Sequence, residues 1–220
     1  VLIVTLNRPE AKNAANLALA QGVAAAMDRL DSDDALTVGI ITGAGGTFCS
    51  GMDLKGFLKG ERPTIPGRGF AGLTEAPPKK PLIAAVDGFA LAGGMEIALA
   101  CDMIVANRNA KFGIPEAKRG LAAAGGGLMR MPRQMPFRVA MEFALTGEFF
   151  GADPATFVAT VDDAYAQLHA LAPQAEVTAV IHVGDSPDQR VDYMGENLIY
   201  YFLVKFCDPR DRKSTRLNSS

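Results

Sequence analysis

The most informative part of the chain is "LAGGMEIALACD", residues 91–102. Two glycines, Gly93 and Gly94, stand at the start of an apolar segment, and a carboxylate, Glu96, follows two residues later. The leucine, alanine and isoleucine residues around Glu96 predict a helix that is largely buried. A buried glutamate is costly unless another group uses or neutralises its charge. We therefore expect this helix to begin at a functional site.

Patterns of strand and helix alternate on both sides of this stretch, over about residues 1–150. Apolar runs predict four buried strands, at residues 1–6, 36–43, 81–88 and 102–107. Apolar residues at helical spacing predict two further helices, at 17–30 and 136–146. Short connections between alternating strands and helices are typical of an α/β domain. Residues 56–80 are rich in glycine, proline and charge, and they predict an excursion on the surface.

The composition excludes several classes of protein. The chain has 220 residues, 49% of them hydrophobic, and a net charge of −2, which is too balanced for a nucleic-acid-binding face. No apolar run approaches the roughly 20 residues of a membrane span. Three widely separated cysteines argue against a disulfide framework or a zinc site. We therefore expect a cytoplasmic protein with neither nucleic-acid nor membrane partners and with no metal site.

The sequence changes character after residue 150. We expect a core over residues 1–150, an atypical C-terminal segment over 151–206 that includes a strand at 177–183, and a polar tail over 207–220. The low apolar content of the tail predicts disorder.

Two glycine-containing segments are candidates for binding a carbonyl oxygen. The N-terminus of a helix presents unpaired N–H groups, and glycine lets a ligand approach them closely, as at Gly93. The loop "CSGMD", residues 49–53, places the N–H of Met52 just after a strand in the same way. Two such donors that converge on one oxygen would form an oxyanion hole. The alternative is that Gly93 and Gly94 only permit tight packing of the helix.

Glu116, in "FGIPEAKRG" at residues 112–120, is a second candidate carboxylate. If Glu96 and Glu116 reach one pocket, they can hold a water between them, one as a base and the other as an acid. The alternatives are a helix-dipole role for Glu96 and an exposed loop charge for Glu116. Both histidines of the chain lie beyond residue 150, so the core offers no histidine for a nucleophile or a metal.

Five segments, taken together and in this order, resemble the crotonase superfamily of enoyl-CoA hydratases and isomerases. They are "TLNRPEAKNA" (5–14), "ITGAGGTFCSGMDL" (41–54), "KPLIAAVDGFALAGGMEIALACDMIVA" (80–106), "AKFGIPEAKRGL" (110–121) and "ALTGE" (144–148). The resemblance covers about residues 1–150 and implies an α/β fold, the crotonase-type spiral of ββα repeats. It also implies an acyl-CoA substrate, no cofactor besides the CoA of that substrate, and assembly as a homotrimer or hexamer.

The resemblance implies roles for individual residues. The N–H groups of Met52 and Gly93 would form the oxyanion hole, and Glu96 and Glu116 would add water in syn fashion across a trans-2-enoyl-CoA. The remaining substrate-binding positions that it implies are Ala11, Lys12, Ser50, Asp53, Leu54 and Gly94.

The sequence departs from the family pattern at two places. Ala124 stands where hydratases often carry a glycine, and the usual continuation after "ALTGE" is absent, so the C-terminus is either divergent or chimeric. An enoyl-CoA isomerase and a non-catalytic CoA-binding remnant therefore remain as alternatives.

Overall fold

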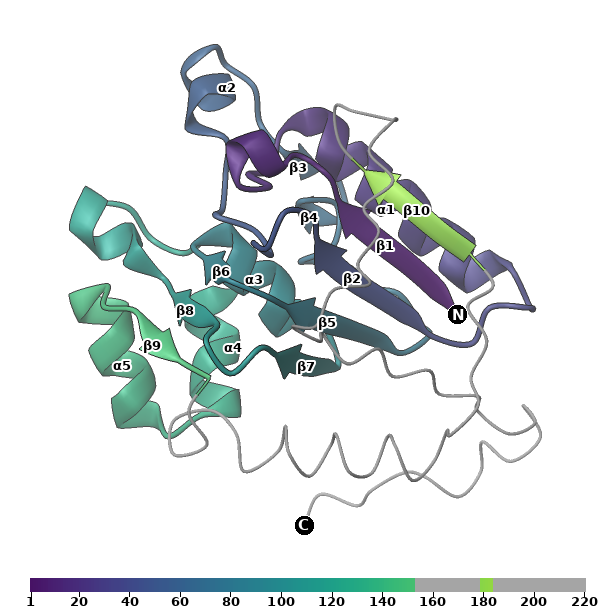
Figure 1. Ribbon diagram of the computed structural model, residues 1–220. Helices are drawn as coiled ribbons and strands as arrows, with labels where there is room; N and C mark the ends of the chain where they lie inside the picture. The colour runs from purple at the N-terminus through teal and green to yellow at the C-terminus, as the bar shows by residue number, and fades with distance from the viewer. Residues whose placement is uncertain (153–178, 184–220) are drawn as a thin grey trace.

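The computed structural model describes residues 1–152 and 179–183, and its largest element is a five-stranded parallel sheet (Figure 1). The strand order is β10 (Ala179–Val183), β1 (Leu2–Leu6), β2 (Gly39–Gly43), β5 (Leu82–Val86) and β7 (Met103–Ala106). These strands are short apolar runs, as expected for a parallel sheet that is covered on both faces. The four strands predicted within the core are confirmed, and so is the strand predicted at 177–183.

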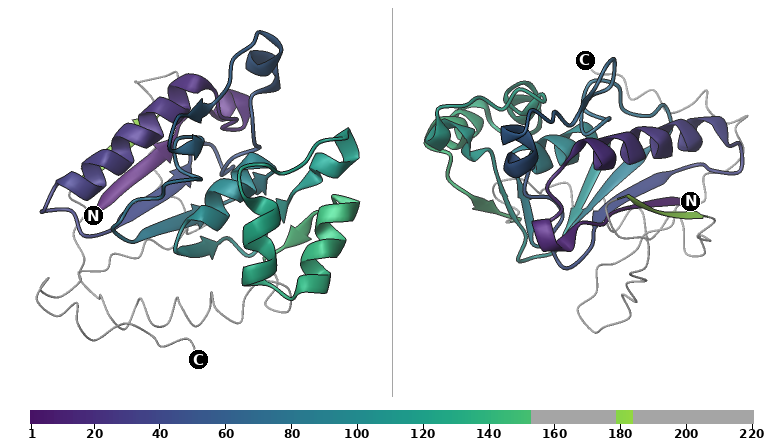
Figure 2. Two further views of the ribbon diagram at one scale, coloured as in Figure 1. Left: turned by 180° about the vertical axis from the view of Figure 1, so that it is seen from behind. Right: turned by 90° about the horizontal axis from the view of Figure 1, so that it is seen from above.

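Alternate residues of the central strands belong to two separate hydrophobic clusters. Leu2, Val4 and Leu6 of β1 join the large cluster, whereas Ile3 joins a smaller one on the opposite face. Helix α1 (Leu17–Ser32) supplies the large cluster with residues such as Met27, and Figure 2 shows it along one face of the sheet. The Asn16 side chain begins this helix by accepting a hydrogen bond from the N–H of Leu19.

A smaller sheet stands beside the main one and carries the candidate site. It contains β6 (Phe89–Leu91), β8 (Lys111–Gly113) and β9 (Phe150–Gly151), with β6 and β8 parallel. The elements that follow its strands are α3 (Gly93–Ala100), the 3-10 helix η2 (Pro115–Arg119), α4 (Gly127–Gln134) and α5 (Phe137–Thr146). Two strands followed by a helix therefore recur, as β5–β6–α3 and β7–β8–α4, which confirms the expected ββα repeats.

The segment 56–80 is only partly the surface excursion that we expected. It contains the end of α2 (Leu54–Leu58) and a short antiparallel pair, β3 (Thr64–Ile65) and β4 (Gly69–Phe70). The residues that follow, Ala71–Thr74, are buried. Gly72 lies against the backbone of Ala20 in α1, where no Cβ would fit. The expectation is therefore wrong for residues 71–74, because a small residue allows this piece to pack on α1.

Most of the C-terminal region lies outside the described residues. The predicted boundaries of the atypical segment at 151–206 and of the disordered tail at 207–220 fall almost entirely there. No helix within the described ranges is both long enough and apolar enough to span a membrane.

Candidate active site

The start of α3 and the loop after β2 lie in direct contact at the candidate site. The main chain of Cys49 pairs with strand β6, because its N–H donates to the carbonyl of Phe89. A Cβ on Gly51 would lie 2.9 Å from the Cβ of Ala92 and 3.3 Å from the nitrogen of Gly93. A Cβ on Gly94 would overlap the carbonyl oxygen of Cys49. The glycines therefore do permit tight packing, and that packing places Gly51, the residue before Met52, beside the nitrogen of Gly93.

Both candidate donor groups are left out of the local hydrogen bonding. Ala15 accepts from Asp53 and donates to the carbonyl of Gly51, so the N–H of Met52 between them takes no part in this pairing. The N–H of Gly93 stands at the first position of α3. Neither N–H donates a hydrogen bond to any residue in the described ranges. Ala92, with φ 51°, makes the sharp turn that leads into α3.

Glu96 is buried on the first turn of α3, as the apolar pattern predicted. Only 4% of the residue is exposed, and its Oε1 accepts a hydrogen bond of 2.9 Å from the N–H of Gly127. A Cβ on Gly125 would lie 2.6 Å from Oε2, so a glycine of the loop before α4 and the first residue of α4 enclose the carboxylate. Burial raises the pKa of Glu96 to about 7, and the nearby charge of Glu116 acts in the same direction.

Glu116 lies on η2 and is half-buried. Its Oε2 is buried and accepts no hydrogen bond from the part of the chain that the structure describes. Burial raises the pKa of Glu116 as well. The neighbouring Lys118 pairs with Glu148 at 2.6 Å and not with Glu116. The alternative of an exposed loop charge is therefore wrong, and Glu116 lies close enough for its charge to raise the pKa of Glu96.

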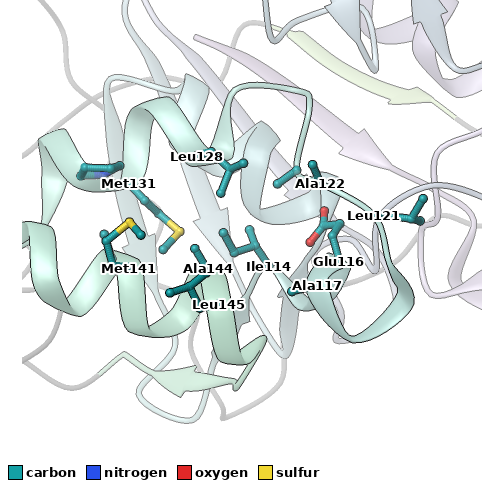
Figure 3. Close-up of a pocket in the computed structure, with 13 residues that line it drawn as sticks. Ile114, Glu116, Ala117, Leu121, Ala122, Leu128, Met131, Met141, Ala144 and Leu145 are labelled. Carbon is teal, nitrogen blue, oxygen red and sulfur yellow. The ribbon is translucent and has the colours of Figure 1, made fainter.

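An apolar cavity of about 400 Å³ opens beside Glu116 (Figure 3). Its wall comes from η2, α4, α5 and the loop before α4, and includes Ile114, Leu128, Met131 and Met141. Among the described residues, Glu116 is the one carboxylate that lines it. A cavity with apolar walls and a single ionisable group can hold an apolar chain with its reactive end at the carboxylate.

The pKa of Glu96 predicts that stability falls as the pH rises. Its pKa is about 7 in the folded chain and 4.5 for a free side chain, so folding favours the protonated form. That stabilisation is complete below pH 4.5 and is lost as the pH rises through about 7, a total change of about 3 kcal/mol at about 1.36 kcal/mol per pKa unit. Urea unfolding at pH 5 and pH 8 measures it. E96Q should remove most of the decrease, whereas E142Q, at an exposed glutamate of α5, should leave it unchanged.

Four of the other predicted substrate-binding residues lie on two adjoining segments, the turn that follows β1 and the segment that runs from the loop after β2 into α2. The N–H of Ser50 donates to the carbonyl of Lys12 at 3.0 Å, which places Ala11 and Lys12 beside the loop that follows β2. Lys12 is exposed, and Leu54 at the start of α2 is exposed to 47%. These four residues therefore share one accessible region of the surface.

Asp53, in contrast, has partners within the protein. Its carboxylate pairs with Arg8 at 3.0 Å and caps α2 by accepting from the N–H groups of Lys55 and Gly56. Burial alone would raise the pKa of Asp53, but these hydrogen bonds and the Arg8 charge hold it below its ordinary value. The side chain thus fastens α2 to the loop after β1, a role that the sequence did not predict.

Sequence reasoning missed the loop that contacts Glu96. No site residue was predicted in the run "LAAAGGG", residues 121–127, yet Gly125 and Gly127 touch the carboxylate. A signal was present, because glycines also stand at the start of α3. Ala124, the position where the sequence departs from the family, is exposed. No group of three or more His, Cys, Asp or Glu side chains in the described ranges could hold a metal ion.

Comparison with known proteins identifies the family. The model of the enoyl-CoA hydratase/isomerase family matches residues 1–187. The chain belongs to this family. The match continues past residue 150, so part of the segment that we expected to be atypical is included in it. The members of the enoyl-CoA hydratase/isomerase family that resemble the chain include enzymes that add or remove water.

Similar proteins come from fungi and bacteria. The chain is 38% identical to the mevalonyl-coenzyme A hydratase sidH of Aspergillus fumigatus, over 86% of this chain and 71% of that protein. It is 43% identical to the enoyl-CoA hydratase EchA19 of Mycobacterium tuberculosis, over 69% of this chain and 59% of that protein. The crystal structure of enoyl-CoA hydratase EchA1 from Mycobacterium marinum superposes with a TM-score of 0.70 at 52% identity, and covers 79% of this chain and 73% of that one.

Proposed function

We propose that the chain catalyses the reversible addition of water to a trans-2-enoyl-CoA. The observation that carries this proposal is the proximity of two carboxyls, the buried Glu96 and the half-buried Glu116, because the charge of Glu116 raises the pKa of Glu96 and its own Oε2 accepts no hydrogen bond from the described residues. Relatives that are named as a hydratase and a dehydratase, 38% and 42% identical to the chain, support the same reaction class.

The proposed mechanism uses the two carboxyls and the two N–H groups together. A water held between Glu96 and Glu116 loses a proton to one carboxylate as its oxygen bonds to the β-carbon of the enoyl group. The other carboxyl delivers a proton to the α-carbon on the same face. Negative charge moves meanwhile to the thioester oxygen, where the N–H groups of Met52 and Gly93 stabilise it. A pKa near 7 suits Glu96 to this work because both of its protonation states are populated near neutral pH.

The acyl group of the substrate is proposed to lie in the apolar cavity beside Glu116. The named substrates of the relatives, mevalonyl-CoA and carnitinyl-CoA, differ in their acyl groups, so those names support a CoA thioester more strongly than any one acyl chain. The CoA portion would run over the exposed surface at Lys12, Ser50 and Leu54.

The first test is hydration of crotonyl-CoA by the 220-residue chain, followed at the absorbance of the enoyl thioester. E116Q should lower kcat by about a thousandfold and change KM by less than about threefold, because the amide keeps the shape but cannot exchange a proton. E142Q is the matched control and should behave as the wild type. If the wild type binds CoA without turnover, the chain is a non-catalytic remnant. If E116Q loses hydration but keeps double-bond migration, the chain is an isomerase.

We also propose assembly into trimers or pairs of trimers, as the family resemblance implies. Three large apolar side chains on α5 support this proposal: Phe137, Met141 and Leu145. They follow one another at four-residue spacing and all are exposed, as is typical of an interface between subunits. The free, buried thiols of Cys49 and Cys101 support placement in the cytoplasm, where cysteines stay reduced.

A further inference from the structure

Hydrogen bonds from an arginine hold the loop before α4, and the mechanism above does not use this arginine. Arg130, on the first turn of α4, is half-buried and reaches back over that loop. Its Nη2 donates to the carbonyl of Thr74 at 2.6 Å, and its Nη1 donates to the carbonyl of Gly125 at 3.4 Å. The guanidinium therefore joins two segments that lie far apart in the sequence.

Three consecutive glycines lead into α4, of which the last is its first residue, and each has its own contact: Gly125, Gly126 and Gly127. Gly125 lies against Oε2 of Glu96, and Gly127 donates to its Oε1. Gly126, between them, has φ +104°, and any Cβ there would overlap Nη1 of Arg130. This triglycine loop therefore has the carboxylate on one side and the guanidinium on the other.

The other segment that Arg130 holds also reaches the site. The N–H of Thr74 donates to the carbonyl of Phe70, so the two residues belong to one turn. The ring of Phe70 lies directly against Gly93, where a Cβ would overlap it. The Arg130–Thr74 bond thus connects the wall beside the Gly93 N–H to the loop that encloses Glu96.

We propose that Arg130 is a positioning residue, whose guanidinium ties the triglycine loop to the Thr74 carbonyl and so holds the Glu96 carboxylate in its working orientation. An arginine suits this role better than a lysine because its planar fork can donate to two carbonyls at fixed angles. Its effect on catalysis rests on the proposed function, whereas its effect on the loop does not.

The charge of Arg130 gives the proposal a second consequence. Helix α3 packs against β6, β7 and α4, and neither β6 nor β7 carries an ionisable side chain. Glu116 from η2 raises the pKa of Glu96, and Arg130 lowers it. Arg133, the other charged residue of α4, is exposed. Removing the charge of Arg130 should therefore raise the pKa of Glu96 and move the acidic limb of the pH–rate profile to higher pH.

The test compares R130Q and R130K with R133Q, a matched change at the exposed arginine of the same helix. Amide hydrogen exchange at Gly127 reports the bond to Glu96 without requiring activity. We expect exchange at Gly127 to be about tenfold faster in R130Q, with unchanged exchange at Met27 in the core, and no change at either site in R133Q. R130K keeps the charge but not the planar fork, so its exchange rate at Gly127 should lie between those of the wild type and R130Q. R130K replaces R130Q in the test if R130Q does not fold.

The kinetic measurement uses the same variants with crotonyl-CoA. R130Q should lower kcat about thirtyfold, leave KM within about threefold, and shift the acidic limb upward, whereas R130K should keep the limb near its wild-type position. Equal exchange at Gly127 in R130Q and R133Q would overturn the proposal, as would faster exchange with kcat and pH profile both unchanged. An inactive wild type would count against the proposed function alone, because the exchange result would still decide the role of Arg130.

Discussion

E96Q is expected to lower kcat for enoyl-CoA hydration by about a thousandfold or more while leaving the fold intact. Glutamine has the shape of glutamate, and its Oε1 can still accept the 2.9 Å hydrogen bond from Gly127. What it lacks is a carboxyl that can exchange a proton, which the mechanism needs at this position whether Glu96 accepts the proton or delivers it. The measurement is steady-state hydration of crotonyl-CoA together with binding of CoA itself.

Two features separate this prediction from a general loss of stability. Burial makes the charged form of Glu96 unfavourable, so the neutral amide should raise the free energy of unfolding at pH 8. The variant should therefore be more stable and less active at once. E142Q provides the control for the substitution itself. A kcat for E96Q within about tenfold of the wild type would remove Glu96 from the proton-transfer step.

The sequence predicted those features that depend on local pattern. The apolar runs located the strands of the main sheet, and the leucines and alanines around Glu96 predicted its burial correctly. The glycine pair correctly predicted a helix start, since α3 begins at Gly93. Each of these features is encoded within about ten neighbouring residues, so periodicity and turn chemistry are sufficient to find it.

Features that depend on contacts between distant residues were not predicted. The bond from Gly127 to Glu96 joins residues 31 apart, and the Arg8–Asp53 pair joins residues 45 apart. Neither pairing leaves a periodic signal in the sequence. The Gly127 contact explains why Glu96 can be buried, and the Arg8 pair gives Asp53 a structural role that the sequence did not predict.

The burial of residues 71–74 was not predicted, for a related reason. Composition marked the whole of 56–80 as a surface excursion, because glycine, proline and charge dominate it. The close approach of Gly72 to α1 also requires a small residue on the helix, and Ala24 supplies it. Such complementarity between two distant positions is invisible to a pattern read along one segment.

G94A is expected to have the largest effect of any single methyl group added at the site. The new Cβ would overlap the carbonyl oxygen of Cys49, which is backbone and cannot rotate away as a side chain could. The start of α3 would have to move away from the loop after β2. We expect the free energy of unfolding to fall by about 3 kcal/mol, as for severe overpacking of a core.

The same displacement should disable the site in molecules that remain folded. The N–H groups of Met52 and Gly93 come from the two segments that the new methyl group would separate, so they could no longer meet on one oxygen. Losing one such donor typically lowers kcat about 10²–10³-fold. Urea unfolding and crotonyl-CoA hydration measure the two effects. G60A is the comparison for an added methyl group without a clash, because nothing lies within 4 Å of a Cβ at Gly60, although its positive φ of +87°, which Gly94 lacks, adds some backbone strain there. If G94A unfolds at the same urea concentration as G60A and keeps its kcat, the close contact of α3 with the Cys49 loop is not what assembles the site.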